Sequence, residues 1–149
     1  MRDKQMPLAV ALMGYGGLIP FIGLALLSNA EPLHGVMYRG ALLLYGAVIL
    51  SFVGAVHWGV ALVDPQLNER DRSALYIWSV IPALIGWCSY IFAPIAASLM
   101  LILGFVFQYW RDLRWARMVS WPGWYLALRL RLTIVASVFL LVGVLPLVT

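Results

Sequence analysis

The chain has 149 residues, of which 64% are hydrophobic and only 11% are charged. Soluble domains carry about 25% charged residues, so the composition excludes an ordinary water-soluble domain and indicates an integral membrane protein. The net charge of +4 does not favour a nucleic acid partner, because basic residues in a membrane protein more often mark the cytoplasmic face.

Five apolar segments follow one another along the chain and predict an all-α fold, a compact bundle of five transmembrane helices that forms a single domain over residues 1–149. The first could instead be a cleaved signal peptide that ends at the phrase SNA, but its 20 apolar residues favour a retained helix. Pro94 alone breaks the run between the third and fourth helices, which predicts a tight hairpin. Pro122 suits the first turn of the fifth helix. The helices are expected at about 8–27, 41–63, 75–92, 95–110 and 122–148.

The distribution of basic residues predicts the orientation in the membrane. With five spans, the N-terminus, the loop at 64–74 and the connection at 111–132 share one face, which should be the cytoplasmic one. The opposite face holds only Arg39, so the N-terminus is expected inside and the C-terminus outside. The nine basic residues of the inner face are Arg2, Lys4, Arg70, Arg72, Arg111, Arg114, Arg117, Arg129 and Arg131.

Glycine and proline residues gather at three places in the apolar segments. Small residues allow helices to approach closely in lipid, and a proline kink is tolerated there. Close helix packing is therefore expected at Gly16, Gly17, Pro20, Gly54, Gly59 and Pro82.

His57 is an ionisable residue inside an otherwise apolar run. It lies seven residues before Asp64, about 10 Å from the cytoplasmic end of its helix. Ionisable residues within a span usually face the bundle interior or a cavity. Other polar groups reach a similar depth, so a ligand-binding site is hypothesised at His57, Asp64, Gln108, Tyr125 and Arg129. A plain hydrogen bond between helices remains the alternative for His57.

The segment Tyr109–Leu132 is basic and rich in tryptophan, a composition that suits the headgroup layer of a membrane. It is either a simple interfacial anchor or a site for anionic lipid or an acidic partner. The residues expected to contact lipid headgroups are Arg111, Arg114, Arg117, Trp115, Trp121, Trp124 and Arg131.

No nucleophile elbow, phosphate-binding loop or metal-ligand motif is present, and the six acids, Asp112 among them, are expected in loops or at helix ends. His34, the second histidine, is expected a membrane's depth away from His57, which argues against a haem or metal held by both. We therefore expect no catalytic residues, no metal and no cofactor.

Several phrases resemble a known family. GLIPFIGLAL, YGAVILSFVGAVHWGVAL, SVIPALIGW and WYLALRLRLT are similar to those of the family called domain of unknown function 3429, whose mitochondrial relatives are named transmembrane protein 69. The resemblance selects Gly54, His57, Trp58, Gly59, Trp124, Tyr125, Leu128 and Arg129, and it implies a bacterial inner-membrane or mitochondrial setting without an activity. The short N-terminus lacks an Arg- and Ser-rich transit peptide, which favours the bacterial inner membrane.

Three functions stay open on this evidence. The first is a non-catalytic accessory protein that binds membrane lipids, anionic ones above all, a membrane-protein partner or a second copy of itself. The second is a binder of a small amphipathic molecule, such as a quinone or lipid precursor, in an inner-leaflet pocket near His57. The third is a small proton-coupled transporter, against which the scarcity of polar groups in the outer half of the helices counts.

Overall fold

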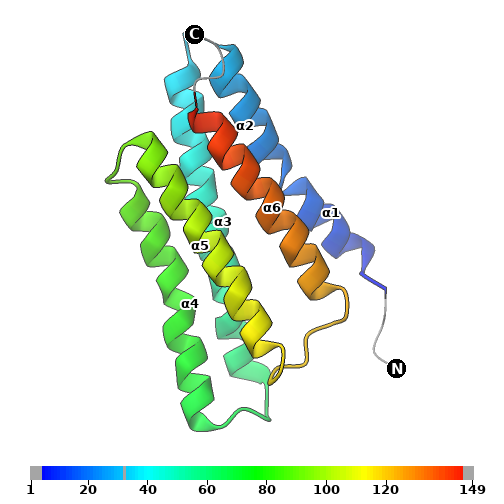
Figure 1. Cartoon of the computed structure of the whole chain (residues 1–149). Coiled ribbons are helices and arrows are strands. Elements are labelled where there is room, and N and C mark those ends of the chain that lie inside the picture. The colour runs from blue at the N-terminus through cyan, green and yellow to red at the C-terminus, as the bar shows by residue number, and fades with distance from the viewer. Residues whose placement is uncertain (1–4, 32, 146–149) are drawn as a thin grey trace.

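The computed structural model describes residues 5–31 and 33–145, and all the regular structure in these ranges is helical. The helices pack side by side in one bundle (Figure 1). Leu8–Ala30, Gly35–Val63, Pro94–Trp115 and Tyr125–Val144 are long and apolar enough to cross a membrane, and the protein is an all-α membrane protein. The fourth helix in chain order, Glu69–Ser89, begins with charged residues and is less apolar, but it lies antiparallel to its neighbours over a similar length.

The first span is a pair of helices, α1 (Leu8–Gly16) and α2 (Ile19–Ala30), where the sequence predicts one helix over 8–27. Pro20 causes the interruption, because it has no N–H to donate to the carbonyl of the preceding turn. The hydroxyl of Tyr45 donates to the Gly17 carbonyl oxygen at 2.8 Å, so a side chain of the next helix satisfies a carbonyl at the break.

Helix α3 (Gly35–Val63) is central and contacts α2, α4, α5 and α6. It begins six residues before the predicted start at Ala41. The prediction placed the charged Arg39 outside the helix, but the helix includes it. The Arg39 Nε donates instead to the Gly143 carbonyl oxygen, 3.2 Å away at the end of α6. At the other end of α3, the guanidinium of Arg72 donates to the carbonyl oxygens of Ala61 and Asp64, which a helix C-terminus leaves without partners, and to that of Leu67 in the following connection.

Helices α4 (Glu69–Ser89) and α5 (Pro94–Trp115) form the predicted tight hairpin. Asn68 caps α4 by accepting a hydrogen bond from the Asp71 N–H. Helix α5 continues to Trp115, five residues beyond the predicted end at Trp110. Helix α6 (Tyr125–Val144) begins three residues after Pro122, because the Tyr125 N–H bonds to the Pro122 carbonyl and closes a turn first.

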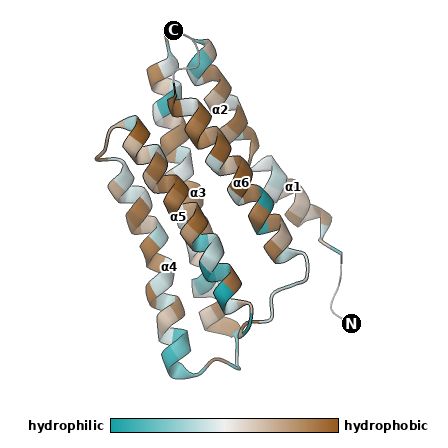
Figure 2. Cartoon of the chain, in the orientation of Figure 1, coloured by the Kyte–Doolittle hydropathy of each residue, from teal (hydrophilic) through white to brown (hydrophobic). Residues whose placement is uncertain are grey.

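The core lies between α2, α3, α5 and α6. Its fully buried side chains include Phe21, Leu42, Leu50, Leu101, Phe105 and Leu140. Hydrophilic residues gather at one end of the bundle, where α4 begins, α5 ends and α6 begins, and the middle of the helices is hydrophobic (Figure 2). We call this end, with the α3–α4 and α5–α6 connections, the basic end.

The predicted packing residues divide into two groups. A Cβ on Gly54 would lie 2.7 Å from Pro82 Cγ, so these two residues fix the close approach of α3 and α4. Gly17 and Pro20 lie at the break between α1 and α2. The expectation was wrong for Gly16 and Gly59, because no atom outside their own helix would lie within 4 Å of an added Cβ.

Candidate functional site

Four polar side chains form a cluster, called here the buried polar cluster, between α3, α5 and α6 near the basic end. His57, Gln108 and Asp112 are completely buried and Arg129 is 6% exposed. The sequence placed His57, Gln108 and Arg129 at a similar depth, and the structure brings them together. Asp112 was expected at a helix end, and it lies in the last turn of α5, but the sequence did not assign it to the site.

The hydrogen bonds of Gln108 set the protonation of the His57 ring. The Trp78 Nε1–H is only a donor, and it lies 2.9 Å from the Gln108 Oε1. The amide NH₂ of Gln108 must therefore face the other way, where it donates to His57 Nδ1 at 2.9 Å. Because Nδ1 accepts this hydrogen bond, His57 is a neutral imidazole with its hydrogen on Nε2.

Asp112 is the acceptor at the centre of the cluster. Its Oδ2 accepts from Arg129 Nε at 2.9 Å, and its Oδ1 accepts from Gln108 Nε2 at 3.4 Å. His57 Nε2 also lies 3.4 Å from Oδ1, although it forms no aligned hydrogen bond. The carboxylate of α5 and the guanidinium of α6 thus neutralise each other inside the bundle.

Three buried polar groups around Arg129 have no hydrogen-bond partner. They are the Arg129 Nη2, the Thr133 hydroxyl and the Tyr125 hydroxyl, the last of which interacts with the Arg129 side chain without reaching hydrogen-bond geometry. Residues 125, 129 and 133 follow at intervals of four along α6, so they share one helix face. Unpaired groups of this kind are costly in lipid, which makes this face the place where a ligand or water would bind.

Trp121 covers the cluster at the basic end. Its ring contacts the His57 ring edge to face with centroids 6.3 Å apart, and it stacks on Tyr125 at 4.4 Å. On the outer side of Trp121 a groove of about 450 Å³ runs between the α3–α4 and α5–α6 connections. Asp64 lines this groove and accepts from the Gln66 N–H at 2.9 Å, so it lies outside the cluster that the sequence assigned it to.

The basic segment places its arginines on tryptophan rings. The Arg111 guanidinium lies 4.5 Å from the Trp78 ring centre and 5.6 Å from that of Trp115, and Arg114 lies 4.9 Å from Trp110. Arg114 is exposed, and so is Arg117.

Other members of the expected headgroup set have different surroundings. Trp115 is 6% exposed and packs with Ala61, Leu75 and Val119, so its ring is turned into the bundle. Trp121 is half-buried, with one side against His57 and the other on the groove. Trp124 is partly buried. Arg131 is exposed and donates to the Tyr15 hydroxyl at 3.0 Å.

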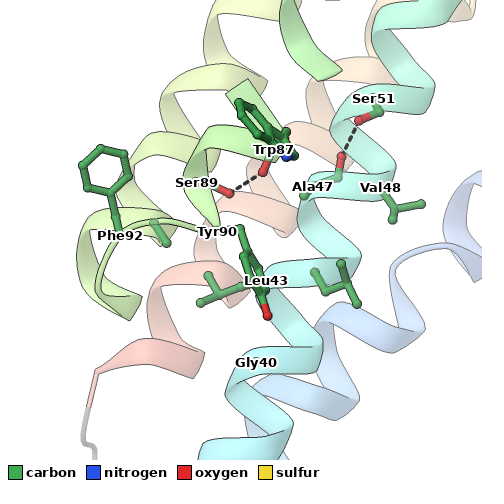
Figure 3. Close-up of a pocket in the computed structure, with 12 residues that line it drawn as sticks. Gly40, Leu43, Ala47, Val48, Ser51, Trp87, Ser89, Tyr90 and Phe92 are labelled. Carbon is green, nitrogen blue, oxygen red and sulfur yellow. Dashed lines mark hydrogen bonds between the residues drawn. The ribbon is translucent and has the colours of Figure 1, made fainter. Parts of the chain in front are cut away.

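A second hollow, of about 360 Å³, opens between α3 and α4 in the half of the bundle away from the basic end (Figure 3). Leu43, Trp87 and Tyr90 line it. Its two serine hydroxyls already donate to backbone carbonyls of their own helices, Ser51 to Ala47 and Ser89 to Gly86. Trp87 and Tyr90 are 69% and 85% exposed, so the hollow has the character of an ordinary lipid-facing groove.

Within residues 5–31 and 33–145, no three His, Cys, Asp or Glu side chains converge as a metal site would require. The buried polar cluster offers one neutral imidazole and one carboxylate that already accepts an arginine. These groups can form hydrogen bonds between helices, and the unpaired donors beside them can bond to an acceptor.

These features define a class of small polytopic helical membrane proteins with a His–Gln–Asp–Arg cluster buried in the bundle. The chain belongs to the family described as Protein of unknown function (DUF3429), whose sequence profile matches residues 6–145. The resemblance noted from the GAVHWG and WYLALRLRLT phrases is confirmed.

Curated relatives carry the name transmembrane protein 69. The protein of Xenopus tropicalis is 37% identical over 142 residues, which are 94% of this chain and 54% of the relative. The protein of Mus musculus is 29% identical over 124 residues, which are 82% of this chain and 49% of the relative. The chain thus spans about half the length of these relatives. No solved structure matches it.

Proposed function

We propose that this chain is a non-catalytic accessory protein of the membrane that binds anionic lipid at its basic end. The observation that carries the proposal is the pairing of Arg111 and Arg114 with tryptophan faces instead of carboxylates. Cation–π contact holds a guanidinium in place and leaves its N–H groups free to meet phosphate oxygens.

Three of the four described acids near the basic end support this reading, because they are already engaged, and the fourth, Glu69, is exposed at the start of α4. Asp112 accepts from Arg129, Asp64 from Gln66 and Asp71 from Asn68. Since His57 is neutral, the ion pair found among the described residues is that of Arg129 with Asp112. Phosphate groups of lipids are the natural counter-ions for the remaining arginines.

The proposal assigns the basic end to the cytoplasmic face of a bacterial inner membrane. Seven of the eight basic residues in the described ranges lie at this end, and Arg39 lies at the other. Such an excess is typical of cytoplasmic loops, and the anionic lipids of that leaflet attract basic residues with about 1 kcal/mol each.

A proton-coupled carrier has less support. Away from the basic end the hydroxyls of Ser28, Ser98 and Tyr45 donate to backbone carbonyls of neighbouring helices. These hydroxyls are used to join helices, whereas a transport path needs polar groups that continue across the midplane.

The test is lipid retention by the full chain in nanodiscs. Wild type and the variant Arg114→Gln/Arg117→Gln are purified from equal mixtures of phosphatidylglycerol and phosphatidylcholine, and the bound lipids are quantified by mass spectrometry. The variant should lose anionic enrichment that corresponds to about 1 kcal/mol for each arginine. Adding Arg111→Gln should extend the loss.

The matched control is Arg114→Lys/Arg117→Lys, which keeps the charge and removes the planar guanidinium. It should keep most of the enrichment, and both variants should keep the wild-type orientation in a reporter assay. Equal enrichment in wild type and in the glutamine variant would overturn the proposal and leave the segment as a topology signal.

A further inference from the structure

A small cavity lies between the α1–α2 break, α3 and α6, and the unpaired groups of α6 form its polar end. Its volume is about 110 Å³. Arg129 and Thr133 line it, with exposed fractions of 6% and 5%, and each carries a donor without a partner, the Arg129 Nη2 and the Thr133 hydroxyl. Two unpaired donors on residues that line an apolar cavity call for an oxygen acceptor.

The rest of the cavity is apolar and reaches the lipid. Phe21 and Leu132 belong to its wall, and Met13 and Phe52, which also line it, are 81% and 70% exposed to the surroundings of the bundle. Helix α1 contributes no buried residue, so it closes this side only loosely. A molecule with an apolar chain can therefore enter sideways from the bilayer.

The charge balance of the site favours a ligand whose polar head group is neutral. Asp112 already accepts from the Arg129 Nε, and His57 is neutral because its Nδ1 accepts from Gln108. The cluster has no net positive charge left to offset a buried anion, whose transfer from water is costly. A carbonyl oxygen, in contrast, accepts both donors without adding charge.

We infer that this cavity binds the carbonyl group of a neutral amphipathic molecule, with Arg129 and Thr133 as donors and the apolar chain lying past Met13 and Phe52. Two kinds of membrane molecule present that chemistry, a prenylated quinone and a glycerolipid ester. This site is separate from the arginines proposed above to bind anionic lipid.

The chain offers matched pairs of variants for the test. Thr133→Val keeps the shape and removes the donor, and its control is Ser137→Ala, which removes another unpaired hydroxyl of α6 that does not line the cavity. Gly14→Ala narrows the cavity, since its added Cβ meets only side chains at 3.5 Å or more. Its control is Gly16→Ala on the same helix, where an added Cβ meets nothing within 4 Å.

The full chain is titrated with three probes, a benzoquinone with one isoprene unit, 1-monooleoylglycerol and oleate, and native mass spectrometry counts the bound molecules. One of the two neutral probes should bind saturably, with one molecule per chain. Binding of the benzoquinone would identify the ligand as a prenylated quinone, and binding of 1-monooleoylglycerol would identify it as a glycerolipid ester. Thr133→Val and Gly14→Ala should weaken its binding by about three- to tenfold, and the two controls should not change it.

Several results would overturn the inference. These are no saturable binding of either neutral probe, stronger binding of oleate than of both, or equal weakening in a variant and its control. The outcome is independent of the lipid proposal, because Thr133→Val should keep the enrichment of phosphatidylglycerol. Conversely, Arg114→Gln/Arg117→Gln should bind the neutral probe as wild type does.

Discussion

The Asp112 carboxylate and the Arg129 guanidinium are the two opposite charges buried in the bundle, and each depends on the other. Asp112→Asn leaves Arg129 as an uncompensated charge, which should lower the free energy of unfolding by about 3–5 kcal/mol. The double variant Asp112→Asn/Arg129→Gln removes both charges and keeps polar groups that can bond to each other. It should recover most of the loss, as measured by steric trapping in bicelles.

A single variant that costs less than about 1 kcal/mol would mean that water reaches the pair. The single variant Arg129→Gln completes the comparison. If the double variant loses as much unfolding free energy as Asp112→Asn and Arg129→Gln together, the two residues are not coupled.

At the scale of single residues, the sequence predicts which side chains are polar and how far into the membrane they lie, but not which of their atoms are in contact. The depth of His57, Gln108 and Arg129 follows from counting residues along apolar helices, and these three do meet. Asp112 was not assigned to the cluster because the helix was expected to end at Trp110, whereas α5 continues to Trp115. Asp64, equally plausible by depth, turns out to stabilise a loop.

At the scale of helices, the contact of α3 with α4 depends on Gly54 facing Pro82. Gly54→Ala would place a Cβ 2.7 Å from Pro82 Cγ and 3.1 Å from the Ser79 carbonyl oxygen, so one helix must shift. We expect a loss of about 1–3 kcal/mol in unfolding free energy. The proline ring and the backbone carbonyl are stiff neighbours, which is why no small rearrangement relieves the contact.

Gly59 is the matched control for this variant, five residues further along the same helix. Since nothing lies within 4 Å of its added Cβ, Gly59→Ala should leave the stability unchanged or raise it by up to about 1 kcal/mol through helix propensity. Equal losses at both glycines would show that helix conformation, and not the α3–α4 contact, is what matters.

Glycine and proline patterns therefore predict where helices bend or pack, but they do not predict which neighbouring residues are contacted there. The phrase around Pro20 indicated a kink, and the structure shows a full interruption because the carbonyl at the break finds the Tyr45 hydroxyl. A sequence without known neighbours cannot show that Gly16 and Gly59 face open space and Gly54 faces a proline. Rotation about each helix axis decides this, and hydropathy leaves it undetermined when a helix is apolar all round.

At the scale of the whole molecule, the bundle predicts opposite sides for the basic end and the C-terminal end of α6. A reporter fused after Thr149, which lies outside the described residues, should be external, and one inserted between Pro65 and Asn68 should be cytoplasmic. The prediction rests on the positive charge of the basic end and on five crossings, α4 included. A cytoplasmic C-terminus would mean that α4 does not cross.

The class of the protein and the succession of its apolar segments followed from composition and hydropathy alone. The arrangement did not, because α3 became the central helix through contacts with four others that no periodicity indicates. The cavity beside α1 depends on the same unforeseen arrangement. It exists because the break at Gly17 and the unpaired face of α6 lie next to each other.

The buried pair of Asp112 and Arg129 also bears on how the chain is made. Helix α5 is synthesised first and carries its carboxylate into the membrane before α6 exists. A lone charge costs about 2.5–3.5 kcal/mol at the centre of a span and less in the last turn, where Asp112 lies. The short connection at 116–124 brings the neutralising guanidinium only one helix later. We expect α5 and α6 to leave the insertion machinery together as one hairpin, so that the cluster is complete only when α6 has entered the membrane.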